Sequence, residues 1–183
     1  LSEEFAEANE YAKIFGLGNV RFFYFDAYEL PLPSESVDKV ALFFSLANIA
    51  RDPQDLERLF DECNRVLKPG GLVGLAEAFL EDFPRELGSL LLELYEYCGE
   101  KGETILSLSD VEAALSKRFK LRRIEQIELR DSGVPADEAA EYLRRYYGSG
   151  VPEELVEAVR SSCDRVWVRD DPPSYHIIVA EKA

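Results

Sequence analysis

The first half of the chain alternates between amphipathic and fully apolar stretches. Residues 2–15 place apolar side chains at helical spacing, which predicts a helix with Ser2 as its N-cap. Residues 20–25 are aromatic or branched, as in a buried strand. Residues 37–45 are apolar on both faces, which is typical of a parallel strand covered by helices.

A helix over residues 52–67 connects this second strand to a third, expected over residues 72–78. Asp52 suits the N-cap, and Pro53 suits the first helical position. The helix has one apolar stripe, formed by Leu56, Leu59, Phe60, Cys63 and Leu67. Strands that alternate with helices in this way predict an α/β fold, with a parallel sheet, right-handed crossovers and helices on both faces.

The second half of the chain is richer in helices. Helices are expected over residues 85–98, 109–119, 136–147 and 152–165, and strands over residues 121–129 and 175–181. A chain of 183 residues is long enough to bury the core of one domain. We therefore expect residues 1–183 to form a single domain. Residues 79–107 and 131–170 are expected to be helical inserts, the latter before the last strand.

The chain is strongly acidic, because 36 Asp and Glu outnumber 21 Lys and Arg and give a formal net charge of −15. Such a surface repels phosphate backbones and anionic lipid, so we expect neither nucleic acid nor a membrane among its partners. Cys63, Cys98 and Cys163 form no closely spaced pair, and the chain has one histidine, so no metal site is expected. Unpaired thiols favour a reducing, cytoplasmic location.

Four short segments near the predicted strand ends carry a family resemblance. They are DAYELPLP at residues 26–33, SVDKV at residues 36–40, Asp52-Pro53, and RVLKPGG at residues 65–71. Together they resemble class I S-adenosylmethionine-dependent methyltransferases, in particular the small-molecule branch that includes the quinone-biosynthesis enzymes. The resemblance covers residues 1–78, and beyond it only the order of helices and strands agrees.

The resemblance implies a Rossmann-like sheet, S-adenosylmethionine as cofactor, and methyl transfer to a small-molecule acceptor without a metal. In that family an acidic residue after the third strand lies near the adenine amino group, and the backbone N–H of the next residue faces the ring. These positions are Asp26 and Ala27 in this sequence. A carboxylate can accept the exocyclic N–H, and a small side chain lets the backbone approach the ring.

The resemblance also implies a role for the end of the next strand. Ser45, Leu46 and Ala47 would line the methionine side of the cofactor and the methyl-transfer pocket. Many members of the family carry a histidine near this loop, and this chain does not, so no catalytic base is assigned there.

Each of these motifs also has a purely structural interpretation. An aspartate after a strand is often a turn residue, and residues 68–71 are explained as a turn between a helix and a strand. Gly16 and Gly18 follow a helix and precede a strand, which is the reverse of the order in a phosphate loop. We interpret them as a helix stop.

The glycine-rich cofactor loop and the ribose-binding carboxylate of the family have no counterpart in the sequence. In the family they come with two strands that separate the equivalents of residues 20–25 and 37–45 in the sheet. We therefore expect the chain to be the N-terminally incomplete part of a longer domain. Otherwise its sheet would be completed by another copy or by a partner chain.

The two helical inserts are the expected acceptor side. Their aromatic side chains could wall an apolar pocket or simply form a core: Tyr95, Tyr97, Tyr142, Tyr146, Tyr147 and Trp167. Arg144 and Arg145 could hold an acidic substrate or belong to a solvated helix face. His176 lies mid-strand, where its neutral ring could act as a base or fill a hydrogen-bonded structural role.

Two other functions are compatible with the sequence. A non-catalytic or degenerate methyltransferase-like subunit would bind a partner chain through the open sheet, and cofactor binding distinguishes it from the enzyme. A dinucleotide-dependent oxidoreductase would have a similar fold, but its glycine fingerprint is absent from the sequence. The methyl acceptor and its reacting atom stay open at this level.

Overall fold

The computed structural model describes residues 2–97, 104–147, 152–162, 165–167 and 172–183. Its main sheet has four strands in the order β1-β2-β6-β3. The strands are β1 (Val37–Phe43), β2 (Leu67–Glu77), β6 (Ser174–Lys182) and β3 (Phe119–Glu128). β1 is parallel to β2, and β6 is antiparallel to both β2 and β3. This arrangement confirms the predicted α/β class.

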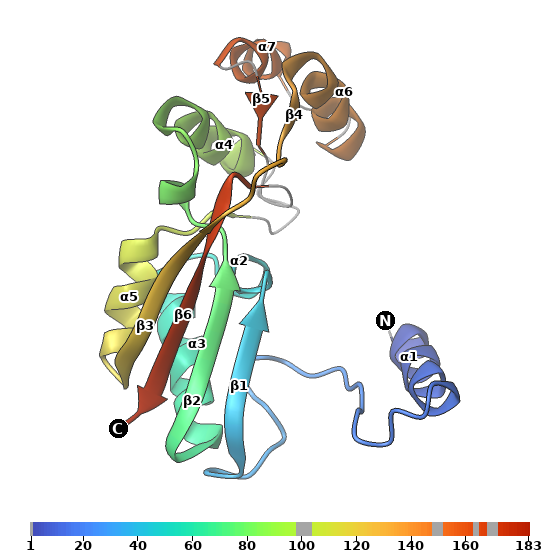
Figure 1. Ribbon diagram of the computed structural model, residues 1–183, viewed down its shortest axis with the longest axis vertical. Coiled ribbons are helices and arrows are strands. Elements are labelled where there is room, and N and C mark those ends of the chain that lie inside the picture. The colour runs from blue at the N-terminus through green and yellow to red at the C-terminus, as the bar shows by residue number, and fades with distance from the viewer. Residues whose placement is uncertain (1, 98–103, 148–151, 163–164, 168–171) are drawn as a thin grey trace.

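Helices α3 (Pro53–Val66) and α5 (Leu108–Ser116) pack against each other and lie on the same face of the sheet (Figure 1). α3 begins as predicted, since the side chain of Asp52 accepts the N–H of Asp55 at 2.8 Å and Pro53 lies in the first turn. The short helix α2 (Leu46–Ile49) links β1 to this crossover. Asp52 thus caps the start of α3, and the chain changes direction after the last residue of α3 to enter β2.

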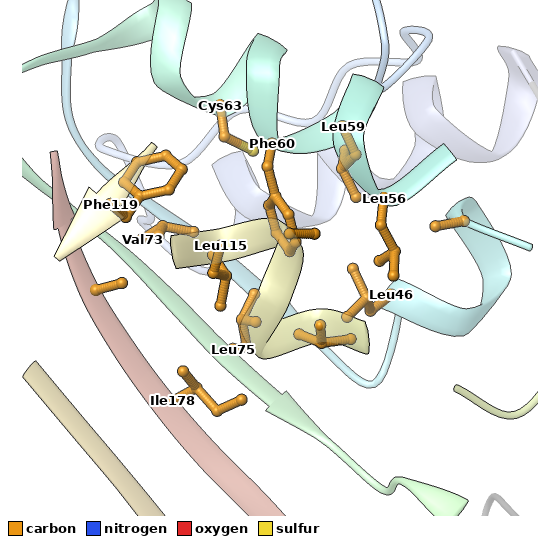
Figure 2. Close-up of a cluster of buried hydrophobic side chains, with 14 of the residues drawn as sticks. Leu46, Leu56, Leu59, Phe60, Cys63, Val73, Leu75, Leu115, Phe119 and Ile178 are labelled. Carbon is orange, nitrogen blue, oxygen red and sulfur yellow. The ribbon is translucent and has the colours of Figure 1, made fainter. Parts of the chain in front are cut away.

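The main core lies between α3, α5 and the sheet (Figure 2). Its side chains are almost completely buried and come from α2, α3, α5 and the strands of the sheet: Leu46, Leu56, Leu59, Phe60, Cys63, Val73, Leu75, Leu115, Phe119 and Ile178. Burial raises the pKa of the Cys63 thiol to about 12, so this thiol is protonated and unreactive at neutral pH. Cys98 and Cys163 lie outside the described residues.

A second group of helices gathers beyond the carboxyl ends of β1 and β2 (Figure 1). It consists of η1 (Leu80–Asp82), α4 (Arg85–Tyr97), β4 (Val134–Pro135), α6 (Ala136–Tyr147), α7 (Glu153–Ser162) and β5 (Arg165–Val166). These elements have an apolar cluster of their own, which includes Leu87, Leu91, Ala139, Leu155 and Val159. We call this group the helical cap.

The indole of Trp167 is part of the scaffold of the helical cap. Its Nε1 donates to the hydroxyl of Ser132 at 3.1 Å. Gly133 lies under the ring at φ +79°, and a Cβ there would come within 2.7 Å of Trp167 Nε1. The ring therefore fixes a tight turn at the entry to β4, where only glycine fits.

Residues 20–25 differ from the prediction, because they form no strand. The side chains of Phe22, Phe23, Tyr24 and Phe25 are 40–62% exposed. Figure 1 shows α1 (Ser2–Ile14) and the extended segment after it standing away from the sheet. The prediction of a buried strand is wrong because strand propensity needs a neighbouring strand, and none of the described strands pairs with this segment.

The side chain of Asn9 forms the backbone hydrogen bonds that a neighbouring strand would otherwise form with Phe22. The amide of Asn9 donates to the carbonyl of Phe22 at 2.7 Å and accepts the N–H of Phe22 at 2.9 Å. Aromatic contacts within the segment replace a core, with Phe5 beside Tyr24 and Phe23 stacked on Phe25 at 5.4 Å between ring centres. The segment is held locally to α1 and leaves the outer edge of β1 unpaired within the described chain.

Residues 68–71 form a bulge within β2 and not the predicted turn before it, because β2 already begins at Leu67. The pairing with β1 passes from Leu67 directly to Leu72, which leaves four residues outside the ladder. Gly70 has φ +74°, and Lys68 forms an ion pair with Asp38 at 2.8 Å. Residues 68–71 therefore shape the backbone at the start of β2 and join it to β1.

The core predicts a contrast between two leucines. Leu59→Ala should lower the free energy of unfolding by about 2–5 kcal/mol, because it empties a fully buried site. Leu32→Ala is the matched control, since Leu32 is 39% exposed and its loss should cost about 1 kcal/mol or less. Urea unfolding of the two variants measures the difference, and equal values would contradict the observed core.

Candidate functional site

The carboxyl ends of β1 and β2 meet at the edge of the sheet that faces the helical cap (Figure 1). A buried carboxylate joins them. Glu77, the last residue of β2, is 2% exposed, and its Oε2 accepts the N–H of Leu46 at 2.9 Å. Its Oε1 accepts the N–H of Ala78 at 3.3 Å. Because a buried hydrogen bond is costly to break, Glu77 fixes the loop after β1.

The residues predicted from this loop divide into two kinds. The side chains of Leu46 and Ala47 are 0% and 2% exposed and belong to the core, as Figure 2 shows for Leu46. Ser45 is half-buried, precedes α2 and makes no side-chain cap bond. The lining role of these three residues stays a prediction.

Asp26 and Ala27 lie in a loop that is anchored beside α2. Asp26 Oδ1 accepts the N–H of Tyr28 at 2.9 Å, which is the turn role that the sequence also allowed. Its Oδ2 has no hydrogen-bond partner in the part of the chain that the structure describes. The hydroxyl of Tyr28 donates to the carbonyl of Ile49 at the end of α2. One carboxylate oxygen of Asp26 is thus used locally, and the other is available.

The rest of this loop is fixed to α3 by an ion pair. Glu62 is buried, and its Oε1 accepts the N–H of Leu30 at 2.7 Å. Arg65 donates to Glu62 Oε2 at 2.7 Å and to the carbonyl of Leu30 at 2.9 Å. The Arg65 guanidinium is the main cause that holds the pKa of Glu62 below its usual range, with the Leu30 N–H adding to the effect. Sequence periodicity did not single out this pair, because both residues are polar positions on a helix.

A second polar cluster lies at the same edge of the sheet. His176 Nδ1 is 2.9 Å from Asp82 Oδ2, and Asp82 also accepts the N–H of Phe79 at 2.9 Å. The hydroxyl of Ser174 donates to Asp82 Oδ1, and so does the Gln126 amide, at 3.0 Å. Sequence reasoning singled out His176 but missed Glu77 and Asp82. The only sequence signal of Glu77 is an acidic residue at the end of an apolar strand, and Asp82 follows in η1 with no signal of its own.

The two predicted arginines of the helical cap, Arg144 and Arg145, are both exposed. Arg144 of α6 forms an ion pair with Glu153 of α7, so it joins two helices. The side chains of the five tyrosines predicted for an acceptor pocket lie outside the described part of the structure: Tyr95, Tyr97, Tyr142, Tyr146 and Tyr147.

Residues 1–75 match the family model described as a methyltransferase domain. The ubiquinone/menaquinone biosynthesis C-methyltransferase UbiE of Idiomarina loihiensis is 27% identical over 110 residues, which are 57% of this chain and 40% of the relative. The UbiE of Acidiphilium cryptum is 44% identical over 64 residues, which are 35% of this chain and 23% of the relative. Over the matched residues, the chain is similar to C-methyltransferases of quinone biosynthesis. The resemblance inferred from the sequence is thereby confirmed.

Solved structures of similar fold cover the whole chain. The YcgJ protein of Bacillus subtilis superimposes with a TM-score of 0.65 at 19% identity, covering 100% of this chain and 79% of that one. A SAM-dependent methyltransferase of Methanosarcina mazei gives a TM-score of 0.63 at 18% identity, covering 100% and 78%. These similarities confirm a Rossmann-like methyltransferase fold. The chain spans 40% or less of the length of the curated relatives cited above.

Two findings bear on the other expected partners. Within the described residues, no helix combines the length and apolar character needed to cross a membrane. The same residues contain no cluster of three or more His, Cys, Asp or Glu side chains that could hold a metal ion.

The Glu62–Arg65 pair predicts a pH-dependent contribution to stability. Since the folded-state pKa of Glu62 is lowered, the stabilisation is present above the pKa of a free glutamate and is lost as the pH falls through the lowered value. Glu62→Gln should therefore lower the unfolding midpoint at pH 7, and the gap to wild type should close below about pH 4. Thermal unfolding between about pH 3 and pH 7, the range in which carboxyls titrate, measures this difference. Glu29→Gln is the control, because Glu29 is exposed, and a constant gap for Glu62→Gln would contradict the assignment.

Proposed function

We propose that this chain forms part of an S-adenosylmethionine-dependent methyltransferase that methylates a small molecule. The observation that carries the proposal is the match of residues 1–75 to the methyltransferase domain family. Relatives named as C-methyltransferases of ubiquinone and menaquinone biosynthesis support a small acceptor. The structural similarity to a geranyl diphosphate methyltransferase, with a TM-score of 0.59, supports the fold on which such chemistry is built.

The residues at the carboxyl edge of the sheet fit one side of this cofactor. The available Oδ2 of Asp26 can accept the exocyclic N–H of an adenine. Ala27 has a side chain small enough for its backbone N–H to approach the ring. The backbone of residues 45–47, held by Glu77, would border the methionine part. Bound S-adenosylmethionine supplies an electrophilic methyl group on a sulfonium.

The contribution of this chain to catalysis would be positioning and exclusion of water. The fixed loops after β1 and β2 hold their backbone groups in one geometry, which lowers the entropy cost of aligning two reactants. The helical cap lies over the same edge and would close it from solvent (Figure 1). We propose that residues 79–107 and 131–170, which supply this cap, form the acceptor side.

A second candidate function rests on a different observation. The outer edge of β1 is unpaired within the described chain, and Phe43 at its end is 68% exposed. A non-catalytic methyltransferase-like subunit would pair this edge with a partner chain. In the enzyme, we propose that the same edge is completed by further strands, from a longer polypeptide or from another copy.

Calorimetric titration with S-adenosylhomocysteine separates the two functions. Saturable binding near one molecule per chain supports the enzyme. A folded chain that releases no heat supports the non-catalytic subunit, provided that thermal unfolding shows it to be cooperative. A comparison with NAD in a thermal-shift assay tests the oxidoreductase, since greater stabilisation by NAD would overturn the methyltransferase.

The adenine role of Asp26 predicts a loss of affinity. Asp26→Asn should weaken binding of S-adenosylhomocysteine about 10-fold, because one charged hydrogen bond is worth about 1.5 kcal/mol. Asp38→Asn is the matched control, because Asp38 lies near the start of β1 and pairs with Lys68. Equal affinity of the Asp26→Asn variant and the wild type would leave Asp26 with the turn role alone.

A further inference from the structure

The single histidine of the chain is held in one orientation by a buried carboxylate. The side chain of His176 is 11% exposed and that of Asp82 is 0% exposed, with 2.9 Å between Nδ1 and Oδ2. Asp82 receives three other donors, namely the Phe79 N–H, the Ser174 hydroxyl and the Gln126 amide. An ionised carboxylate only accepts hydrogen bonds, so Nδ1 must carry the proton. In the neutral ring the lone pair is therefore on Nε2.

The Nε2 atom of His176 remains accessible. It has no hydrogen-bond partner within the described chain. Among the described side chains, the Nη1 atom of Arg118 alone is both fully buried and without a partner. Nε2 is therefore in contact with solvent. A histidine that served only to fill the interior would have no need to keep this nitrogen open.

The position of His176 relates it to the edge described above. Its pairing partner on β2 is Glu77 and its pairing partner on β3 is Gln126, so the three residues form one row across the sheet. Glu77 is the residue whose carboxylate holds the loop after β1. His176 thus lies at the edge where β1 and β2 end and above which the helical cap begins (Figure 1).

Polar groups from three elements surround the ring of His176. η1 contributes the carboxylate of Asp82, β2 contributes that of Glu77, and β3 contributes the neutral amide of Gln126. The ring of Phe79 lies at 5.8 Å. A carboxylate on Nδ1–H orients an imidazole and stabilises the imidazolium that forms when Nε2 takes a proton.

We propose that His176 takes the proton from the methyl acceptor, with Asp82 as its positioning residue. This inference rests on the proposed methyl transfer. The electron pair of the acceptor atom forms the bond to the methyl carbon, and the carbon–sulfur bond breaks with its pair left on sulfur. The proton that the acceptor atom loses passes to Nε2 and then to solvent. The acceptor is therefore a molecule with a removable C–H, O–H or N–H proton, and a tertiary amine or thioether is excluded.

The tautomer can be measured without any activity. Because the chain has one histidine, the imidazole signals of the ¹⁵N-labelled protein need no assignment. We expect the neutral ring to carry its proton on Nδ1, and diethyl pyrocarbonate to modify one group per chain, at Nε2. A proton on Nε2, or a ring that resists the reagent in the folded protein, would overturn the proposal.

A matched variant tests the catalytic step. In His176→Asn the side-chain amide can keep the donor to Asp82 but lacks Nε2, so the fold is preserved while the base is lost. We expect kcat to fall by about 100-fold or more, as for loss of a general base. KM and affinity for S-adenosylhomocysteine should be unchanged, and the residual rate should rise with pH as the acceptor ionises by itself. Unchanged kcat with an unchanged pH profile would assign His176 a structural role.

An error in the role of His176 can be distinguished from an error in the proposed methyl transfer. If the wild type binds no S-adenosylhomocysteine and transfers no methyl group, methyl transfer itself is wrong, whatever the tautomer. If the wild type is active and His176→Asn is equally active, only the role of His176 is wrong. Asp82→Asn provides the positioning test, because it should alter the tautomer signal and the pH profile of kcat together. A changed rate with the wild-type tautomer and pH profile would contradict the role of Asp82.

Discussion

The apolar stripe of α3 is buried between the sheet and α5, and the positions of β1, β2 and the loop of residues 26–30 follow from that packing. α3 connects β1 to β2, so burying it on one face sets the parallel register of the two strands. The loop of residues 26–30 is then fixed to the same helix through Glu62 and Arg65. Apolar burial thereby determines where the polar edge of the sheet lies.

The polar edge is built by carboxylates that are desolvated and saturated with donors. Glu77 accepts the N–H of Leu46, and Asp82 accepts four donors, which are the N–H of Phe79 just before η1, one side chain of β3 and two side chains of β6. Such groups are costly to bury unless each lone pair is used. These hydrogen bonds hold the backbone at the carboxyl edge of the sheet in one geometry. A site that aligns a cofactor with an acceptor requires such a fixed geometry.

The sequence pattern predicts an element correctly where the element depends on residues that are close together in the chain. Asp52 and Pro53 start α3, and the apolar runs of β1 and β2 are correctly located, because caps and periodicity act within a few residues. The prediction for residues 20–25 is wrong, because aromatic residues favour a strand only where a neighbouring strand can pair with them. No described strand pairs with this segment. Asp82 and His176 are 94 residues apart, and their contact exists only after β6 returns to the centre of the sheet. No local signal predicts it.

The exposed aromatic segment next to α1 has a consequence for colloidal stability. Four successive aromatic side chains on an extended backbone would favour association between molecules if the molecules could approach one another. A formal charge of −15 keeps them apart through long-range repulsion at neutral pH and low salt. That protection vanishes near the isoelectric point of about 4.5 and is screened at high ionic strength. Repulsion between the acidic surfaces thus opposes association through the exposed aromatic segment.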